Sequence, residues 1–283
     1  MRGLPEGPKS GRVWSPVEGD RTIEEKPHNA WRFLQDADGN LALFKYLRPG
    51  ASHFENYTLG IEWTAYALGT VLGIPVAPVY LERFNGTPGV LSPWLENSMS
   101  WWLFRQRNHK AKTLTNSHLL PLSAVFDVWI ANCDRWEKNV LVQADPPRNS
   151  LESAECLSIW LIDHGVSMLW PGVKFGLRDD GSDLSKAVID NGDTEAEKYI
   201  RDRMLGGKNT RLYWHNLLDM EKQQRCRLYE KVKEIDDATI EGAVNKVPGA
   251  FMSRALVDLT VHMLKARRDR VDDLVERLLE VPA

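Results

Sequence analysis

The sequence lacks the features by which several classes of protein are recognised. Its three cysteines, Cys133, Cys156 and Cys226, are odd in number and widely spaced, so they fit neither a disulfide framework nor a zinc motif. No apolar run approaches the roughly 18–20 residues of a transmembrane helix. The N-terminus has no apolar core of signal-peptide length. We therefore expect a protein of the reducing cytoplasm, without a membrane partner.

Charge of one sign is also scarce. The 36 Lys and Arg residues nearly balance the 39 Asp and Glu residues, which gives a net charge of -3. This balance provides no general attraction to nucleic acid, and no direct nucleic-acid binding is predicted. Positive charges do gather at residues 267–270, but acids alternate with them, which favours a solvated helix face over a binding patch.

The first part of the chain carries mixed strand and helix signals. The 283 residues are enough for one large domain or for two lobes around separate small cores. Residues 1–30 are polar and rich in Pro and Gly, which predicts an irregular lead-in. Residues 31–95 are predicted to form a small β-rich lobe. Its expected elements are two strands within Trp31–Tyr46 around a turn at 36–40, a helix over about 55–72, and strands over Val76–Phe84 and Gly89–Trp94.

The helix expected over residues 55–72 has a periodic pattern. Apolar side chains, among them Leu59, Trp63 and Tyr66, recur at three- and four-residue steps. One face of the helix should therefore be buried. Gly73 suits a left-handed cap and Pro75 prevents continuation, so the helix should end just before them.

Residues 96–283 have a mostly helical character. A buried helical face runs from Leu122 to Ile130, and two apolar strands follow at Asn139–Val142 and Ile159–Ile162. From about residue 184 to the end the pattern is again helical. The sequence therefore predicts an α/β (α+β) protein, in which a small β-rich N-lobe and a helical C-lobe meet at a hinge near residues 92–96.

Three polar residues lie where these expected elements end. Asp134 and Asn139 stand five positions apart between a helix and a strand, and Asp163 follows the next strand. Phosphoryl transfer from ATP needs Mg²⁺ and a group that orients the attacking hydroxyl. One carboxylate can direct the hydroxyl proton, while a second carboxylate and an amide oxygen can hold the metal. The alternative is that Asp134 merely ends a helix and Asn139 merely begins a strand.

A lysine stands in the middle of an otherwise apolar strand. Lys45 is costly to bury there unless it is paired. Glu62 lies on or beside the buried face of the next helix, so the two residues are predicted to make contact. Such a pair aims a lysine at ATP phosphates. The competing interpretation is an edge-strand lysine and a solvated glutamate.

These segments together resemble a HipA-like kinase, within the protein-kinase and phosphatidylinositol 3-/4-kinase-like superfamily. The resemblance covers roughly residues 31–170 and implies a two-lobed protein-kinase-like fold with ATP and Mg²⁺ as cofactors. The segments that carry it are Leu43–Tyr46, Leu68–Val76, Asn132–Asn139 and Leu161–Gly165. The implied roles are phosphate contact for Lys45 with Glu62 as its partner, catalysis for Asp134, Mg²⁺ ligation for Asn139 and Asp163, and contact with ATP at the hinge for Ser92 and Trp94.

The sequence departs from this family pattern at several places. The turn at 36–40 has one glycine and lacks the G-x-G-x-x-G that covers phosphates in protein kinases. Trp136 stands where lipid kinases usually have His, and His164 stands where protein kinases have Phe.

The resemblance favours a Ser/Thr side chain of a protein as the phosphoryl acceptor, and an antitoxin or regulatory partner would be in keeping with it. A small-molecule or lipid acceptor is one alternative, and a nucleotide-binding pseudokinase without turnover is another.

Overall fold

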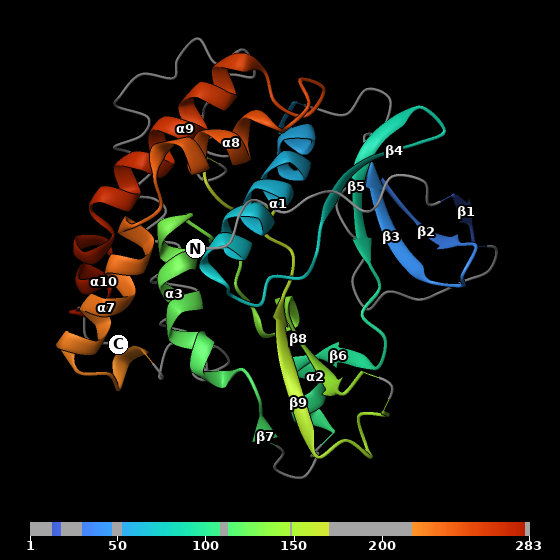
Figure 1. Ribbon diagram of the computed structural model, residues 1–283, viewed down its shortest axis with the longest axis horizontal. Helices are drawn as coiled ribbons and strands as arrows, with labels where there is room; N and C mark the ends of the chain where they lie inside the picture. The colour runs from blue at the N-terminus through green and yellow to red at the C-terminus, as the bar shows by residue number, and fades with distance from the viewer. Residues whose placement is uncertain are drawn as a thin grey trace.

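The computed structural model describes residues 13–17, 30–46, 53–107, 113–147, 149–169 and 217–280. A twisted sheet forms the N-lobe, and helices with a second, smaller sheet form the C-lobe (Figure 1). One helix, α1, lies between the N-lobe sheet and the C-terminal helices.

The N-lobe sheet has five antiparallel strands in the order β1-β2-β3-β5-β4. The expectation that residues 1–30 are irregular is wrong at Trp14–Pro16, because this segment pairs with β2 as an edge strand. The remaining strands agree with the sequence pattern to within a few residues. Their bounds are β1 Trp14–Pro16, β2 Ala30–Asp36, β3 Leu41–Tyr46, β4 Tyr80–Phe84 and β5 Thr87–Pro93.

The turn at 36–40 closes on itself at the end of the β2–β3 hairpin. The Asp36 carboxylate accepts hydrogen bonds from the backbone N–H of Asp38 and Asn40, and Gly39 takes a φ of +84°. In the hairpin register Lys45 pairs with Trp31, four pairs from the turn. At ~3.3 Å per residue the turn is roughly 13 Å from Lys45, so it is badly placed to cover phosphates bound there.

Helix α1 (His53–Leu72) is buried on more sides than its periodicity predicts. Nearly every side chain from Tyr57 to Gly69 is inaccessible to solvent. The face expected to be exposed packs on the C-terminal helices. Gly60, for example, approaches Val247 and Met252 so closely that a Cβ there would lie 2.7 Å and 2.9 Å from their side chains.

The C-lobe holds a second sheet, with strand order β6-β8-β9-β7, beside its helices. The segment after α1 joins this sheet instead of beginning the strand expected at Val76, because Leu161 of β9 bonds to both Pro75 and Ala77. The helical pattern is confirmed over 217–280, whereas residues 184–216 lie outside the described residues. The bounds are β6 Ser98–Ser100, α2 Trp101–Gln106, β7 Thr113–Leu114, η1 Ser117–Leu119, α3 Leu120–Trp129, η2 Glu137–Asn139, β8 Val140–Asp145, β9 Cys156–Leu161, α7 Lys222–Lys233, α8 Asp237–Asn245, α9 Arg254–Asp269 and α10 Val271–Leu279.

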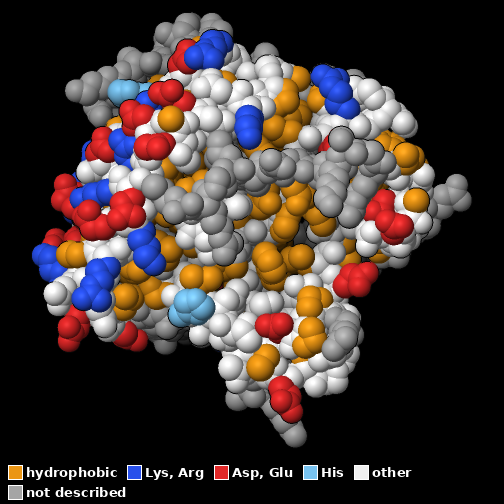
Figure 2. Space-filling model, in the orientation of Figure 1, with side chains coloured by type: hydrophobic (Ala, Val, Ile, Leu, Met, Phe, Trp, Pro, Cys, Tyr) orange, Lys and Arg blue, Asp and Glu red, His pale blue; other side chains and the backbone are white. Residues whose placement is uncertain are grey.

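Two hydrophobic cores of unequal size stabilise the molecule. The large core joins α1, α3, β8, β9 and α7–α10, so it crosses the boundary between the lobes. The small core lies within the N-lobe sheet and consists of Leu34, Ala42, Phe44, Phe84 and Leu91. Charged side chains gather over the C-terminal helices, on the left in Figure 2. Among the described helices, none combines the length and the apolar character that crossing a membrane requires.

Candidate active site

Lys45 and Glu62 meet at the junction of β3 and α1. Nζ of Lys45 lies 2.6 Å from Oε1 of Glu62, and both side chains are buried. The same Nζ lies 3.6 Å from Oδ1 of Asp163, which follows β9. The predicted contact between Lys45 and Glu62 is therefore present, and Asp163 joins it to form a cluster of one cation and two carboxyl groups.

The electrostatics of this cluster favour a charged lysine. Burial by itself lowers the pKa of Lys45, but the carboxylates of Asp163 and Glu62 outweigh it and hold that pKa above its ordinary value. Burial raises the pKa of Glu62, and the neighbouring ammonium group offsets only part of this effect. Lys45 is thus a cation over the physiological pH range and can donate hydrogen bonds to an anion.

Asn139 is tied to Asp134 through its side-chain amide. Nδ2 of Asn139 donates to the backbone carbonyl of Asp134 at 2.7 Å and lies 3.3 Å from Oδ2 of the same residue. An amide nitrogen only donates and an amide oxygen only accepts. The bonded nitrogen therefore leaves the amide oxygen of Asn139 as the atom that can face a cation.

The Asp134 carboxylate is oriented by its neighbours in the loop. Nε1 of Trp136 donates to Oδ1 of Asp134 at 2.6 Å, and the backbone N–H of Asp134 donates to Oδ1 of Asn132 at 3.0 Å. Asp134 is partly exposed, and the Trp136 side chain is 40% exposed. A carboxylate held in this way at the surface can receive an incoming hydroxyl group.

Asp163 has an unusual backbone for a residue with a side chain. Its φ of +55° lies in the left-handed region, which costs on the order of 1 kcal/mol or more for a residue other than glycine. Its side chain is 47% exposed, in contrast to the buried Lys45 and Glu62. The conformation turns the carboxylate out of β9 and toward Lys45.

The residues predicted at the hinge lie in and just after β5. Ser92 pairs with Leu43 of β3, and the backbone N–H of Trp94 donates to the carbonyl of Leu41 at 2.8 Å. The Trp94 backbone donor is therefore already used. Within the described part of the chain, the backbone N–H groups of Leu95 and Glu96 donate no hydrogen bond, so they are better placed to serve an adenine.

An aromatic row on the sheet was not anticipated from the sequence. Trp31 and Phe33 of β2 stand opposite Lys45 and Leu43 of β3, and directly opposed residues share a face of the sheet. The Phe33 ring makes edge contacts with Trp31 at 5.8 Å and with Trp94 at 5.2 Å between centroids. Trp31 and Phe33 alternate in β2, as Leu43 and Lys45 do in β3. This period-two spacing in the two strands of one hairpin could have revealed the shared face.

Arg135 was also overlooked, although it adjoins Asp134 in the sequence. It is 2% exposed and forms an ion pair with Asp127 of α3, with Nε 2.9 Å from Oδ2. No sequence signal distinguishes such a buried arginine from a solvated one, since its partner lies on the preceding helix.

The donor atoms suit Mg²⁺ better than a softer metal. The described residues contain no group of three or more His, Cys, Asp or Glu side chains placed to hold a metal ion. Mg²⁺ usually binds through one or two carboxylates together with substrate phosphates and water. The half-exposed carboxylate of Asp163 and the amide oxygen of Asn139 are oxygen ligands of the kind that this requirement names.

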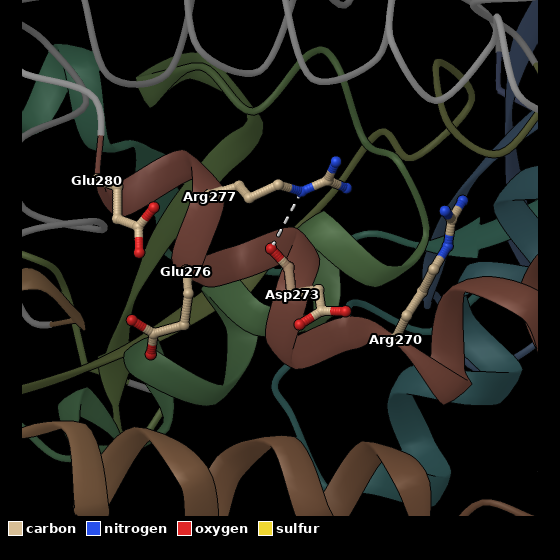
Figure 3. A pocket seen from close by; sticks show the side chains of 5 residues that line it. All are labelled: Arg270, Asp273, Glu276, Arg277 and Glu280. Atoms are coloured by element: carbon tan, nitrogen blue, oxygen red, sulfur yellow. Dashed lines mark hydrogen bonds between the residues drawn. The ribbon is translucent and has the colours of Figure 1, made fainter.

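A separate hollow lies on α10. It has a volume of about 290 Å³ and is shown in Figure 3. Its walls carry both signs of charge and contain none of the predicted site residues, so it favours no ligand of one sign. The lining residues are Arg270, Asp273, Glu276, Arg277 and Glu280.

Comparison with solved structures identifies the architecture. The Helicobacter pylori proinflammatory kinase CtkA superimposes with a TM-score of 0.54 at 14% identity, covering 96% of this chain and 98% of that protein. The fold is kinase-like. The Neurospora crassa PAN3 pseudokinase gives a TM-score of only 0.27 at 11% identity, covering 98% of this chain and 67% of that one. Neither protein-family models nor curated protein sequences produced a match.

Proposed function

We propose that the protein is an ATP- and Mg²⁺-dependent phosphotransferase of the HipA-like type, acting on a Ser or Thr side chain of a protein. One observation carries this proposal. The buried Lys45–Glu62 pair lies within 3.6 Å of Asp163, which is the arrangement that phosphate contact and metal ligation require together. The kinase-like fold supports the same conclusion at a coarser level.

Each residue of the site then has a distinct task. Lys45 binds ATP phosphates and Glu62 keeps its ammonium group aimed at them. Asp134 accepts a hydrogen bond from the acceptor hydroxyl and orients it for attack. Asn139 and Asp163 would hold Mg²⁺, which when bound neutralises charge on the phosphates.

The nucleotide is expected to lie between the lobes. The aromatic face with Phe33 and Trp94 would border the adenine, and the donors of Leu95 and Glu96 would bind its edge. Ser92 remains a neighbour of this site through its position on β5.

Two other functions share the same fold. A small-molecule or lipid kinase would need the same residues at ATP and a different acceptor site. A pseudokinase would bind nucleotide or a partner without turnover. The presence of Lys45, Glu62, Asp134, Asn139 and Asp163 together favours an active enzyme over this third candidate.

Incubation with γ-labelled ATP, alone and with a cell lysate, separates these candidates. A labelled protein band, on this chain or in the lysate, is the expected result. A labelled small product would replace the protein acceptor by a metabolite or lipid. Binding of ATP without any labelled product would identify a pseudokinase. The Asp134→Asn variant serves as the inactive control.

Metal dependence provides an independent prediction for Asp163. The Asp163→Ala variant should weaken Mg-ATP binding far more than binding of ATP in EDTA, because it removes a metal ligand rather than a nucleotide contact. Isothermal titration calorimetry measures both affinities. The matched control is Asp38→Ala, an exposed aspartate in the β2–β3 turn. Equal losses with and without metal would show that Asp163 has a structural role instead.

A further inference from the structure

The guanidinium group of Arg135 connects the two segments that carry the proposed metal ligands. Its Nη1 donates to the backbone carbonyl of Asn139 at 2.7 Å and to that of Ile162 at 2.8 Å. Its Nη2 lies 2.7 Å from Nε2 of His164. Arg135 therefore contacts Asn139 itself and the residues on both sides of Asp163.

His164 is the acceptor in this contact. Its Nε2 lies 2.7 Å from Nη2 of Arg135, and an arginine can only donate. Nε2 of the imidazole therefore accepts the hydrogen bond. A phenylalanine at this position could not accept that bond.

The charge of Arg135 is compensated from the other side. Asp127 accepts from Nε at 2.9 Å and from Nη2 at 3.3 Å, and it also accepts from Nδ2 of Asn132 at 2.8 Å. A buried ion pair of this kind contributes little net stability, but removing one partner leaves an uncompensated charge. The pair is thus better explained by the geometry that it imposes than by stability.

We propose that Arg135 is a positioning residue that sets the separation of Asn139 and Asp163 and holds Asp163 in its left-handed backbone conformation. The proposal rests on the proposed function for the metal-ligand roles of these two residues. Its contacts with Ile162 and His164 restrain the chain on either side of Asp163. A strained residue keeps such a conformation only where its surroundings over-determine it.

The test separates positioning from a merely structural role. Arg135→Met leaves the Asp127 carboxylate buried without its counter-ion, so this variant alone could fail to fold. The double variant Arg135→Met/Asp127→Asn removes both charges, and an amide at 127 can still accept from Asn132. A third variant, His164→Phe, removes one arginine contact and keeps both charges.

Three quantities are compared with wild type: the thermal midpoint, the affinity for ATP with Mg²⁺ and with EDTA, and the amide exchange of the loops. Informative amides are those of Ile162, Cys133 and Met168, which bond to Asn139, Val166 and Ile130. The thermal midpoint of the double variant should return most of the way from that of Arg135→Met to that of wild type. Its affinity for Mg-ATP should still be at least tenfold lower than that of wild type, whereas its affinity for ATP in EDTA should change less than twofold. The backbone amide of Ile162 should exchange faster. His164→Phe should show the same pattern, with a two- to fivefold loss of affinity for Mg-ATP.

The proposal would be overturned if the double variant recovered three wild-type properties together. These are the thermal midpoint, the affinity for Mg-ATP and the amide exchange of the loops. The exchange measurement needs no ligand, so it tests the positioning role of Arg135 independently of nucleotide binding. Failure of the wild-type protein to bind ATP at all would overturn the proposed function instead.

Discussion

The N-lobe sheet and helix α1 are neighbours in the chain, but they are stabilised in different ways. The sheet has its own small core of five buried residues. Helix α1 belongs to the large core, and its Trp63 indole donates to the carbonyl of Ala243 in α8 at 3.2 Å. Near the start of α1, the Tyr57 hydroxyl accepts from the backbone N–H of Leu169 at 3.1 Å.

This difference divides the proposed site between two bodies. Glu62 is presented by the same body that carries Asp134, Asn139 and Asp163, since α1 is fixed to the C-terminal helices. Lys45 and the aromatic face come from the sheet. Regions with few buried contacts open at lower free energy than core elements. Val90 of β5 also packs in the large core. We therefore expect the Lys45–Glu62 pair to be one of the contacts between α1 and a less buried sheet.

The largest expected effect comes from a change confined to the C-terminal body. Asp134→Asn keeps the shape of the side chain but removes the charge that we propose orients the acceptor hydroxyl. Transfer should fall by about 10²–10⁴-fold, while ATP affinity and the thermal midpoint should change little. Turnover with labelled ATP and calorimetry measure these quantities. The matched control is Asp258→Asn, an exposed aspartate on α9. Near-normal turnover in Asp134→Asn would remove this residue from the role.

The next largest effect is expected from removing the Lys45–Glu62 pair. A hydrogen bond between charged groups is worth ~1.5–3 kcal/mol, which corresponds to roughly 10–150-fold in rate. The loss of activity in Lys45→Met should lie near the top of that range, because this variant also removes the proposed phosphate contact. The loss of activity in Glu62→Gln should lie near the bottom of the range, since Lys45 keeps Asp163 as a partner.

The double variant tests whether the two residues act together. Lys45→Met/Glu62→Gln should lose hardly more activity than Lys45→Met alone, because the second change damages an interaction that is already absent. Steady-state kinetics on all four proteins give the coupling. Additive losses would mean that Lys45 and Glu62 contribute separately, and that the sheet and α1 are not joined through this pair.

Local sequence patterns predicted the contact between Lys45 and Glu62 and singled out the other residues of the candidate site. Lys45 stood out because it interrupts an apolar strand, and Glu62 because its helical position faces inward. Asp134, Asn139 and Asp163 stood out because they lie at the ends or starts of strong periodic elements. All of these signals lie within a few residues of the position concerned.

Other features depend on partners far along the chain and left no such signal. Helix α1 is buried on the face that its own pattern leaves polar or small, because α8 and the segment after it cover that face. Arg267 lies in a run predicted to be solvated, yet it is fully buried and donates to the carbonyls of Val128 and Trp129 at the end of α3. A local pattern cannot show which distant carbonyls need a donor.

A matched pair of glycine substitutions sharpens the comparison between the two regions. Gly60→Ala places a Cβ 2.7 Å from Val247 in the large core, whereas Gly89→Ala in β5 places one 2.4 Å from the Lys45 carbonyl oxygen. Overpacking costs ~1–3 kcal/mol, and in a helix the better propensity of alanine offsets about 1 of it. Gly60→Ala should lower the global midpoint by a few degrees with activity nearly intact.

The sheet variant should behave in the opposite way. In Gly89→Ala the new methyl group meets backbone, so β5 and β3 must separate at Lys45. Activity should fall several-fold, and amide exchange should quicken in the N-lobe strands more than in α1. A drop in the global midpoint as large as that of Gly60→Ala, with uniform exchange, would show that sheet and helix form one cooperative unit.

The smallest effect is expected for an ion pair far along the chain from Lys45 and Glu62, between α7 and α10. Glu276 accepts from Arg225 at 2.9 Å and 3.0 Å and from the Tyr229 hydroxyl at 2.9 Å. Its side chain is about one-fifth exposed, so solvent screens the pair. Glu276→Gln should therefore cost only ~1 kcal/mol at pH 7 and should leave activity unchanged. Glu280→Gln, at an exposed residue that caps the end of α10, is the control.

The pH dependence of this last variant follows from the direction of the shift. The hydrogen bond from Arg225 is the main cause that holds the pKa of Glu276 below its ordinary value of 4.5. A group whose pKa is lower in the folded state stabilises the protein above its unfolded pKa and loses that contribution as the pH falls through the folded one. The stability difference between wild type and Glu276→Gln should thus be constant from pH 7 to about 5 and shrink below pH 4.5. Urea unfolding at a series of pH values measures it, and a difference that grows with acid would contradict the assignment.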